Sequence, residues 1–222
     1  MKPKRKSRGQ FIIIAVLLTA IMIVSIGALM HTAVTYYKHE PWEEYATLIG
    51  DIEVNSARIV ELSLASYTSP GGRQNILSDN LERWQNNLTI IYPSSGIFLR
   101  ASNNQTYKGS FSSTASADFS LKITSIGLTG YKFSVSTALN VEITKSDPTL
   151  KEITVVVTDE SGQPIPNLKT SNFQINGTTP LAVRPFYDPL KILVYTIQYQ
   201  GTLPATLDVM DPRGIHATGT AS

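Results

Sequence analysis

The chain has 222 residues, no cysteine and a formal net charge of only +2. The absence of cysteine excludes a disulfide framework, a thiolate metal site and a thiol nucleophile. Five of the 19 basic residues lie among the first ten positions, where there is no acid; the other 14 accompany 17 acids, so the rest of the chain carries −3. A nucleic-acid-binding fold needs a basic face, and this distribution does not favour one.

An uncharged stretch of 20 residues, from Phe11 to Met30, follows this basic tail. About 20 apolar residues with a rise of ~1.5 Å each can span a hydrocarbon core of ~30 Å. Basic flanks of such a helix stay in the cytoplasm. The sequence therefore predicts a single-pass protein of the cell membrane, with a cytoplasmic tail at 1–10, a transmembrane helix and its boundary at 11–37, and an extracellular body.

The residues directly before the apolar run, Lys6 to Phe11, read Lys-Ser-Arg-Gly-Gln-Phe. This flank resembles the class III signal peptide of archaeal type IV pilin-like proteins. The resemblance implies cleavage between Gly9 and Gln10, removal of a leader at 1–9 and retention of the apolar helix. Many pilins carry a glutamate five residues into the mature chain, where this sequence has Ile14, which weakens the case for filament assembly. A plain signal anchor with basic flanks is the alternative.

A membrane-proximal α+β domain is predicted for residues 38–146. Apolar residues at helical spacing predict helices at 42–66 and 73–87, separated by the Ser-Pro-Gly-Gly sequence at 69–72. Trp42 and Trp84 are expected to pack the helices onto a sheet or to lie at the membrane boundary, and a ligand-stacking pair is the alternative.

From Leu88 onward the apolar residues alternate with polar ones, which predicts strands with one buried face. The first strand is expected in the sequence LTIIYP at 88–93. The strands at 118–126 and 131–143 are expected to form an antiparallel hairpin. For the serine-rich run 110–116 the sequence allows either a loop or an edge strand.

A second module is predicted for residues 147–222, with short strands at 153–157, 172–176, 191–200 and 206–210. Its first strand and turn contain Val157-x-Asp159-x-x-Gly162-x-Pro164-Ile165-Pro166. This pattern resembles bacterial Ig-like and carboxypeptidase-regulatory-like modules, and the resemblance implies an Ig-like β-sandwich without a catalytic residue. The expected fold class is α+β, mostly β: a transmembrane helix, a helical pair packed on an antiparallel sheet, and the sandwich.

Three Asn-x-Ser/Thr sequons lie in the predicted extracellular body, at Asn87, Asn104 and Asn176. They are candidate glycosylation sites of a glycoprotein, although such triplets also arise by chance in a chain rich in asparagine, serine and threonine.

No pattern in the sequence predicts catalysis, a metal site or a cofactor. His31, His39 and His216 lack the spacing of zinc ligands. Helix-dipole and turn roles account for the acid pairs Glu43-Glu44 and Asp159-Glu160. Asp208 and Asp211 alone supply too few oxygens for calcium.

The sequence therefore favours a non-enzymatic surface protein with a structural or adhesive task, of which a pilin-like subunit is one form. Its expected partners are the lipid bilayer and other copies or other surface proteins. Neither a nucleic acid nor a small-molecule substrate is predicted. An accessory subunit of a membrane complex is the first alternative, and an ectoenzyme with a dispersed site is the second.

Overall fold

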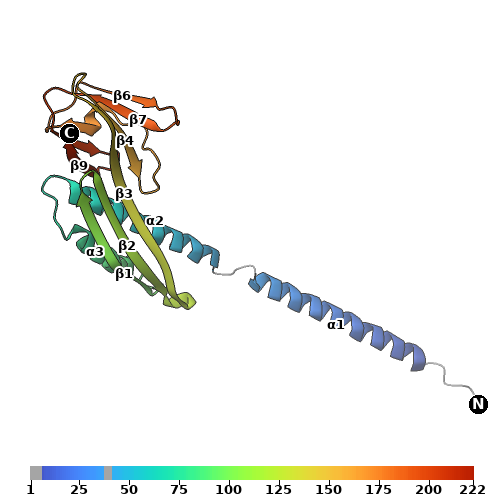
Figure 1. The fold of residues 1–222 in the computed structure, drawn as a ribbon. Helices are drawn as coiled ribbons and strands as arrows, with labels where there is room; N and C mark the ends of the chain where they lie inside the picture. Colours follow the sequence, from blue (N-terminus) through green and yellow to red (C-terminus); the bar gives the residue numbers. More distant parts are fainter. Residues whose placement is uncertain (1–6, 38–41) are drawn as a thin grey trace, which may run out of the picture. The chain divides into compact units, whose positions relative to one another are not determined.

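A computed structural model describes the backbone of residues 7–37 and 42–222, and the side chains of residues 16–32 and 45–222. It forms an α+β fold, rich in strands, with three α-helices and two antiparallel sheets (Figure 1). The chain divides into two compact units between Ile49 and Gly50. The expected α+β class is confirmed at this level.

Helix α1 runs from Ser7 to Tyr37, about 46 Å along its axis. Its described large apolar side chains, from Val16 to Met30, are 54% to 70% exposed. Among the residues whose side chains are described, no helix is long and apolar enough to cross a membrane. The span predicted at Phe11–Met30 gains no support from that finding and stays a prediction.

Helix α2 (Trp42–Thr68) confirms the helix expected at 42–66. One face of it is buried through Ile52, Val60 and Leu64, which recur at helical spacing. The helix ends where expected, before the glycine pair: the Ser69 amide still donates to the carbonyl of Ala65.

Helix α3 (Ile76–Ile91) extends beyond the helix expected at 73–87. The strand expected at 88–93 is therefore wrong. Leu88 is fully buried and lies seven residues after Leu81, so it continues the buried stripe of the helix instead of starting an alternating pattern. Helices α2 and α3 cover one face of β1–β3 (Figure 1).

A six-stranded antiparallel sheet has the order β1-β2-β3-β4-β7-β6. The hairpin expected around residues 118–143 is confirmed, because β2 pairs with β3 from Ser112↔Asn140 to Ile123↔Leu128. The serine-rich run lies mostly in β2, an interior strand. The strands are β1 (Ile97–Gly109), β2 (Ser112–Ile123), β3 (Leu128–Asp147), β4 (Glu152–Asp159), β6 (Ala182–Tyr187) and β7 (Leu193–Gln198).

Strand β3 connects the two predicted modules. Its first part pairs with β2, and its last part, from Leu139 to Asp147, pairs with β4. Residues on both sides of position 147 thus belong to one sheet. The division predicted at 146/147 falls within the last residues of β3, just before the turn to β4, and it stays a prediction.

The second sheet has three strands in the order β5-β8-β9. It packs on the six-stranded sheet through Phe173 of β5 and Tyr195 of β7, whose ring centroids lie 5.7 Å apart and which are both fully buried. The short strands expected around these positions are confirmed, whereas β6 and β9 were not expected. The strands are β5 (Phe173–Ile175), β8 (Ala205–Met210) and β9 (His216–Ala221).

Candidate functional site

The expected processing position lies near the start of α1. Gly9 and Gln10 belong to the first turns of that helix, and their side chains, like that of Phe11, lie outside the described ranges. Met30, at the other end of the predicted span, is 65% exposed. The expected cleavage remains a prediction.

The three sequon asparagines are all exposed, on three different elements. Asn87 lies near the end of α3, and Asn104 lies in β1 beside the irregularity between Ser102 and Gln105. Asn176 follows β5, and its Oδ1 accepts a hydrogen bond of 2.8 Å from the backbone N–H of Thr206. Exposure is compatible with modification at each site.

The densest polar constellation surrounds Arg213 in the turn between β8 and β9. Its Nε lies 2.6 Å from Asp211 Oδ2 and its Nη1 lies 2.9 Å from Glu160 Oε2. Nη1 also donates to Thr137 Oγ1 at 3.0 Å, and Nη2 donates to the carbonyl of Ala138 at 2.8 Å. We call these five residues the Arg213 cluster.

The electrostatics of the Arg213 cluster favour the charged form of each partner. Burial would lower the pKa of Arg213, but its hydrogen bonds to Glu160 and Asp211 raise that pKa above its usual value. Burial would likewise raise the pKa of Glu160, but the hydrogen bonds from Arg213 and from backbone N–H groups bring it below the ordinary value. The guanidinium is also 3.9 Å from Glu61 on α2.

The Arg213 cluster joins three elements, β3, the turn after β4 and the turn between β8 and β9, and the longer contact with Glu61 extends it to α2. Its carboxylates are occupied by these structural contacts. Asp211 Oδ1 accepts the backbone N–H groups of Arg213 and Ile215, and Asp159, next to Glu160, accepts those of Ser161 and Gln163. The turn role expected for Asp159 is therefore confirmed, and the cluster has the features of a structural clamp.

A second polar group lies on the three-stranded sheet. His216 Nδ1 is 2.9 Å from Asp208 Oδ2, and Thr218 donates to the other carboxylate oxygen at 2.8 Å. Burial would raise the pKa of Asp208, but these two hydrogen bonds hold it below its ordinary value. The nearby Ser113 hydroxyl donates to the backbone carbonyl of His216 at 2.6 Å and not to the imidazole, so the group lacks an activated nucleophile.

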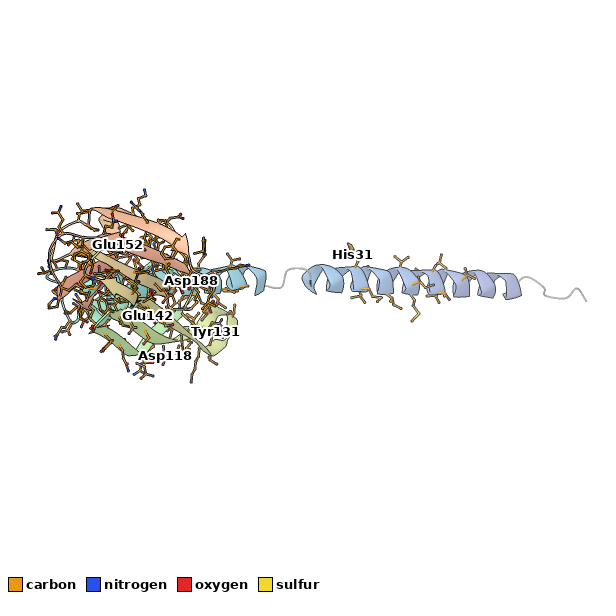
Figure 2. All side chains as sticks on the ribbon, turned by 45° about the horizontal axis from the view of Figure 1, so that its top comes forward. His31, Asp118, Tyr131, Glu142, Glu152 and Asp188 are labelled. Carbon is orange, nitrogen blue, oxygen red and sulfur yellow. The ribbon has the colours of Figure 1, made fainter. Side chains whose placement is uncertain are left out.

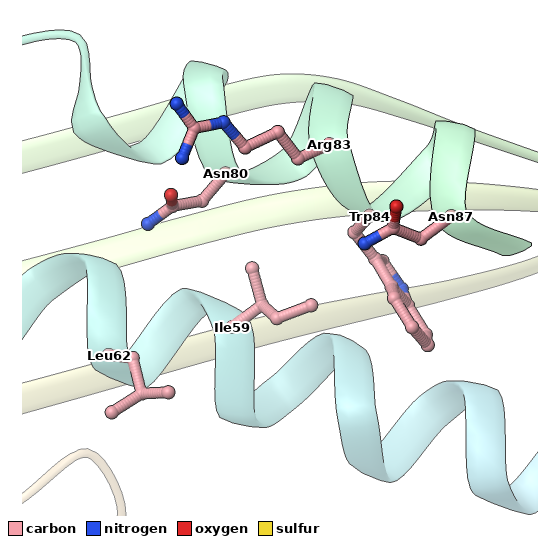
Figure 3. Close-up of a pocket in the computed structure, with 6 residues that line it drawn as sticks. All are labelled: Ile59, Leu62, Asn80, Arg83, Trp84 and Asn87. Carbon is pink, nitrogen blue, oxygen red and sulfur yellow. The ribbon is translucent and has the colours of Figure 1, made fainter.

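A groove of about 260 Å³ runs between α2 and α3 (Figure 3). Trp84 lies in it and donates through Nε1 to the buried Ser56 of α2 at 3.0 Å, so it packs the two helices together. The side chain of Trp42, its suggested stacking partner, lies outside the described ranges. The groove is smaller than most ligand pockets, which have ~300–1,000 Å³. Its lining residues are Ile59, Leu62, Asn80, Arg83, Trp84 and Asn87.

Acidic side chains elsewhere do not converge. Asp118, Glu142, Glu152 and Asp188 lie apart on the strand-rich body (Figure 2). Within the side chains that the structure describes, no three His, Asp or Glu residues are placed to hold a metal ion. His31 is exposed on α1, and the Glu43-Glu44 pair lies outside the described side chains.

Another hollow, of about 240 Å³, lies at the β6–β7 side of the six-stranded sheet. Pro166, Pro185, Phe186 and Tyr187 contribute to its lining, together with Tyr195, whose hydroxyl is engaged with the backbone carbonyl of Ile165 at 2.7 Å. This part of the surface is apolar and carries few polar groups that could orient a small ligand.

The Arg213 cluster was not expected from the sequence, because its members are separated by up to 76 residues and belong to no local motif. Comparisons of the chain with protein-family models, with curated proteins and with solved structures find no match.

Proposed function

We propose that the protein is a membrane-anchored extracytoplasmic surface protein with a structural or adhesive role, built like a pilin subunit. The observation that carries the proposal is the apolar surface of α1. Ten large apolar side chains between Val16 and Met30 are each more than half exposed, and an uncovered apolar surface of this kind needs lipid or other apolar helices around it.

The anchor would consist of the whole uncharged run Phe11–Met30, part of which lies outside the described side chains. The basic residues before this run support an orientation with the amino terminus in the cytoplasm. The strand-rich body then lies outside the cell. The flank Lys6–Phe11 supports removal of residues 1–9 between Gly9 and Gln10, by resemblance to archaeal class III signal peptides.

For the carboxyl-terminal part we propose an Ig-like sandwich, as used in spacer and adhesion modules. Strands β4, β7 and β6 of the large sheet and the sheet β5-β8-β9 pack through Phe173 and Tyr195. The Tyr195 hydroxyl also binds the backbone of the segment before β5, at Ile165 and Leu168. These contacts support a two-layer arrangement of this segment.

An accessory role in a membrane complex is the second candidate, and the groove between α2 and α3 favours it. Leu62, which lines the groove, is 53% exposed, and Val54, two helical turns earlier on α2, is 69% exposed. A partner helix would cover both. Constant co-purification of another protein in mild detergent would favour this candidate if that protein is lost on Leu62→Glu and kept on Arg184→Glu, a control at an exposed site of β6 away from α2.

The leading proposal is tested by protease treatment of intact cells combined with mass measurement of the native protein. We expect external protease to remove the body, residues 42–222, without cell lysis, and the mass to correspond to a chain that starts at Gln10. A body protected until lysis would contradict the orientation. Retention of residues 1–9 would contradict the pilin-like processing and leave a signal anchor. Mass added at Asn87, Asn104 or Asn176 would identify a glycoprotein.

A further inference from the structure

The turn between β6 and β7 gathers apolar side chains at an exposed end of the sheet. Phe186, Tyr187, Leu190 and Ile192 are 45%, 69%, 78% and 37% exposed, and Leu190 is the most exposed large apolar side chain among the described residues. We call residues 186–192 the β6–β7 tip. Contiguous exposed apolar groups of this kind mark surfaces that leave water on binding.

The backbone of the β6–β7 tip is largely satisfied within the turn. Asp188 N–H donates to the carbonyl of Ile192 at 3.0 Å, and Lys191 N–H donates to that of Asp188 at 2.9 Å. Ile192 N–H donates to Asp188 Oδ1 at 2.8 Å, and Pro189 has no N–H. A turn with few free backbone donors can leave water at low cost, which is the requirement for entering lipid.

The edge beside the tip is poorly suited to a partner strand. β6 is an edge strand of the six-stranded sheet, and Pro185 removes one backbone donor from it. Proline on an edge strand opposes strand addition. Main-chain pairing with a protein partner is therefore disfavoured here, which leaves the apolar side chains as the binding groups.

The charges around the tip favour an anionic surface. Arg184 and Lys191 are exposed, and Asp188 is the only acid between positions 181 and 192. Lys191 can place its ammonium among headgroups while Leu190 inserts below it, and Tyr187 suits the boundary between headgroups and acyl chains. The positive charge here contrasts with the net −3 of the chain beyond its basic tail.

We propose that the β6–β7 tip docks into the headgroup layer of an anionic lipid bilayer, through Leu190, Ile192 and Tyr187 with Lys191 at the phosphate level. This contact is separate from the anchor assigned to α1 and goes beyond it, because it gives the body a lipid-binding site of its own.

The chain contains a matched control turn. Asp147-Pro148-Thr149-Leu150-Lys151, between β3 and β4, resembles Asp188-Pro189-Leu190-Lys191 in composition, and its Leu150 is 62% exposed. Asp147 accepts the backbone N–H groups of Thr149 and Leu150, as Asp188 accepts that of Ile192. The control turn lacks apolar neighbours equivalent to Phe186, Tyr187 and Ile192, so we expect it to stay in water.

The absence of cysteine allows site-specific labelling with an environment-sensitive fluorophore through Leu190→Cys or, as the control, Leu150→Cys. The full-length protein is reconstituted into phosphatidylglycerol-containing vesicles. Two samples are compared. In the first, the vesicles that hold the protein carry a lipid-attached quencher. In the second, those vesicles lack the quencher, and vesicles that carry it are added afterwards. We expect a blue shift and quenching at position 190 in at least one sample, and neither at position 150.

A blue shift at 190 without lipid quenching in either sample would show protein contact and overturn the proposal, as would no change at all. Flotation with the host vesicles in high salt, which screens the attraction of Lys191 to the anionic lipid, reports the α1 anchor separately: a protein that floats without a signal at 190 keeps the anchor and loses the tip. If the protein does not float but is quenched by the added vesicles, the proposed α1 anchor is contradicted and the proposed lipid binding of the β6–β7 tip is supported.

Charge reversal tests the role of Lys191. We expect Lys191→Glu to lower the quenched fraction at position 190 about fivefold or more at low salt, in line with the attraction of single basic residues to anionic surfaces. Lys151→Glu should leave it unchanged. Equal quenching in purely zwitterionic vesicles would overturn the anionic specificity.

Discussion

Arg213 Nη1 and Glu160 Oε2 lie 2.9 Å apart although 53 residues separate them in the chain. The pair connects the turn between β8 and β9 to the turn after β4. Because the same guanidinium reaches the side chain of Thr137 and the carbonyl of Ala138 in β3, one side chain holds both turns against the middle of the large sheet.

Arg213→Met should lower the free energy of unfolding by about 2–4 kcal/mol, because it leaves the fully buried Asp211 carboxylate without its cationic partner. Urea unfolding of the full-length protein in mild detergent, followed by tryptophan fluorescence, measures the loss. Arg184→Met, at an exposed site on β6, should change stability by less than about 0.5 kcal/mol. Equal effects of the two variants would contradict the clamp.

Acid should destabilise the body through Glu160 and Asp208. Both carboxyl groups have a pKa below the ordinary value, 4.5 for Glu160 and 3.8 for Asp208, so their contribution is complete above those values and is lost as the pH falls through the folded-state pKa. Urea unfolding at a series of pH values from 7 to 3 should show this decline. Glu160→Gln should flatten it, whereas Glu142→Gln, on an exposed site of β3, should not.

Tyr195→Phe should destabilise the body by about 1–3 kcal/mol. The hydroxyl donates to the carbonyl of Ile165 and accepts the N–H of the buried Leu168, and its removal leaves both backbone groups without that partner. Thermal unfolding gives the comparison with Tyr187→Phe, where the ring is 69% exposed and little change is expected. A neutral Tyr195→Phe variant would show that water replaces the hydroxyl.

Gly96→Ala should be more destabilising than Gly127→Ala. Both glycines have positive φ, 59° and 69°, so alanine is strained at each by about 1–2 kcal/mol. A Cβ at position 96 would also collide with the Thr124 side chain, whereas one at position 127 meets open space. Denaturant midpoints of the two variants separate the collision from the shared backbone strain; identical midpoints would show that Thr124 moves aside.

Periodicity predicted the elements whose buried face consists of large apolar residues. Helix α2 and the β2–β3 hairpin were predicted because residues such as Val60 and Leu64, or Leu121 and Ile123, repeat with the spacing of one buried face. The first half of β2 was left open because its buried face uses Ser113, Ala115 and Ala117, whose small side chains carry little hydrophobic signal.

The strand wrongly expected at 88–93 shows the limit of a short apolar run. Thr89, Ile90 and Ile91 favour a strand by type, but Leu88 is fixed by burial on the same helix face as Leu81, and the helix continues through them. Ile90 and Ile91 are exposed as a result, at 74% and 57%. Tertiary contacts outweighed local preference there.

The Arg213 cluster could not be predicted from the sequence for a different reason. Arg213 stands in a Pro-Arg-Gly turn, where an arginine is usually solvated, and nothing local identifies Glu160 or Thr137 as its partners. Only the pairing of β3 with β4 and the packing of the second sheet bring these residues within hydrogen-bonding distance.

The 20 residues of β3 give the body a continuous mechanical element. A load pulling β2 against β4 would act in shear on two hydrogen-bonded ladders that overlap on the same strand near Leu139 and Asn140. A shear load acts on many of the hydrogen bonds between the strands at the same time, whereas peeling breaks them one after another. Under such a load the body would thus yield at its turns before the two halves of this sheet came apart.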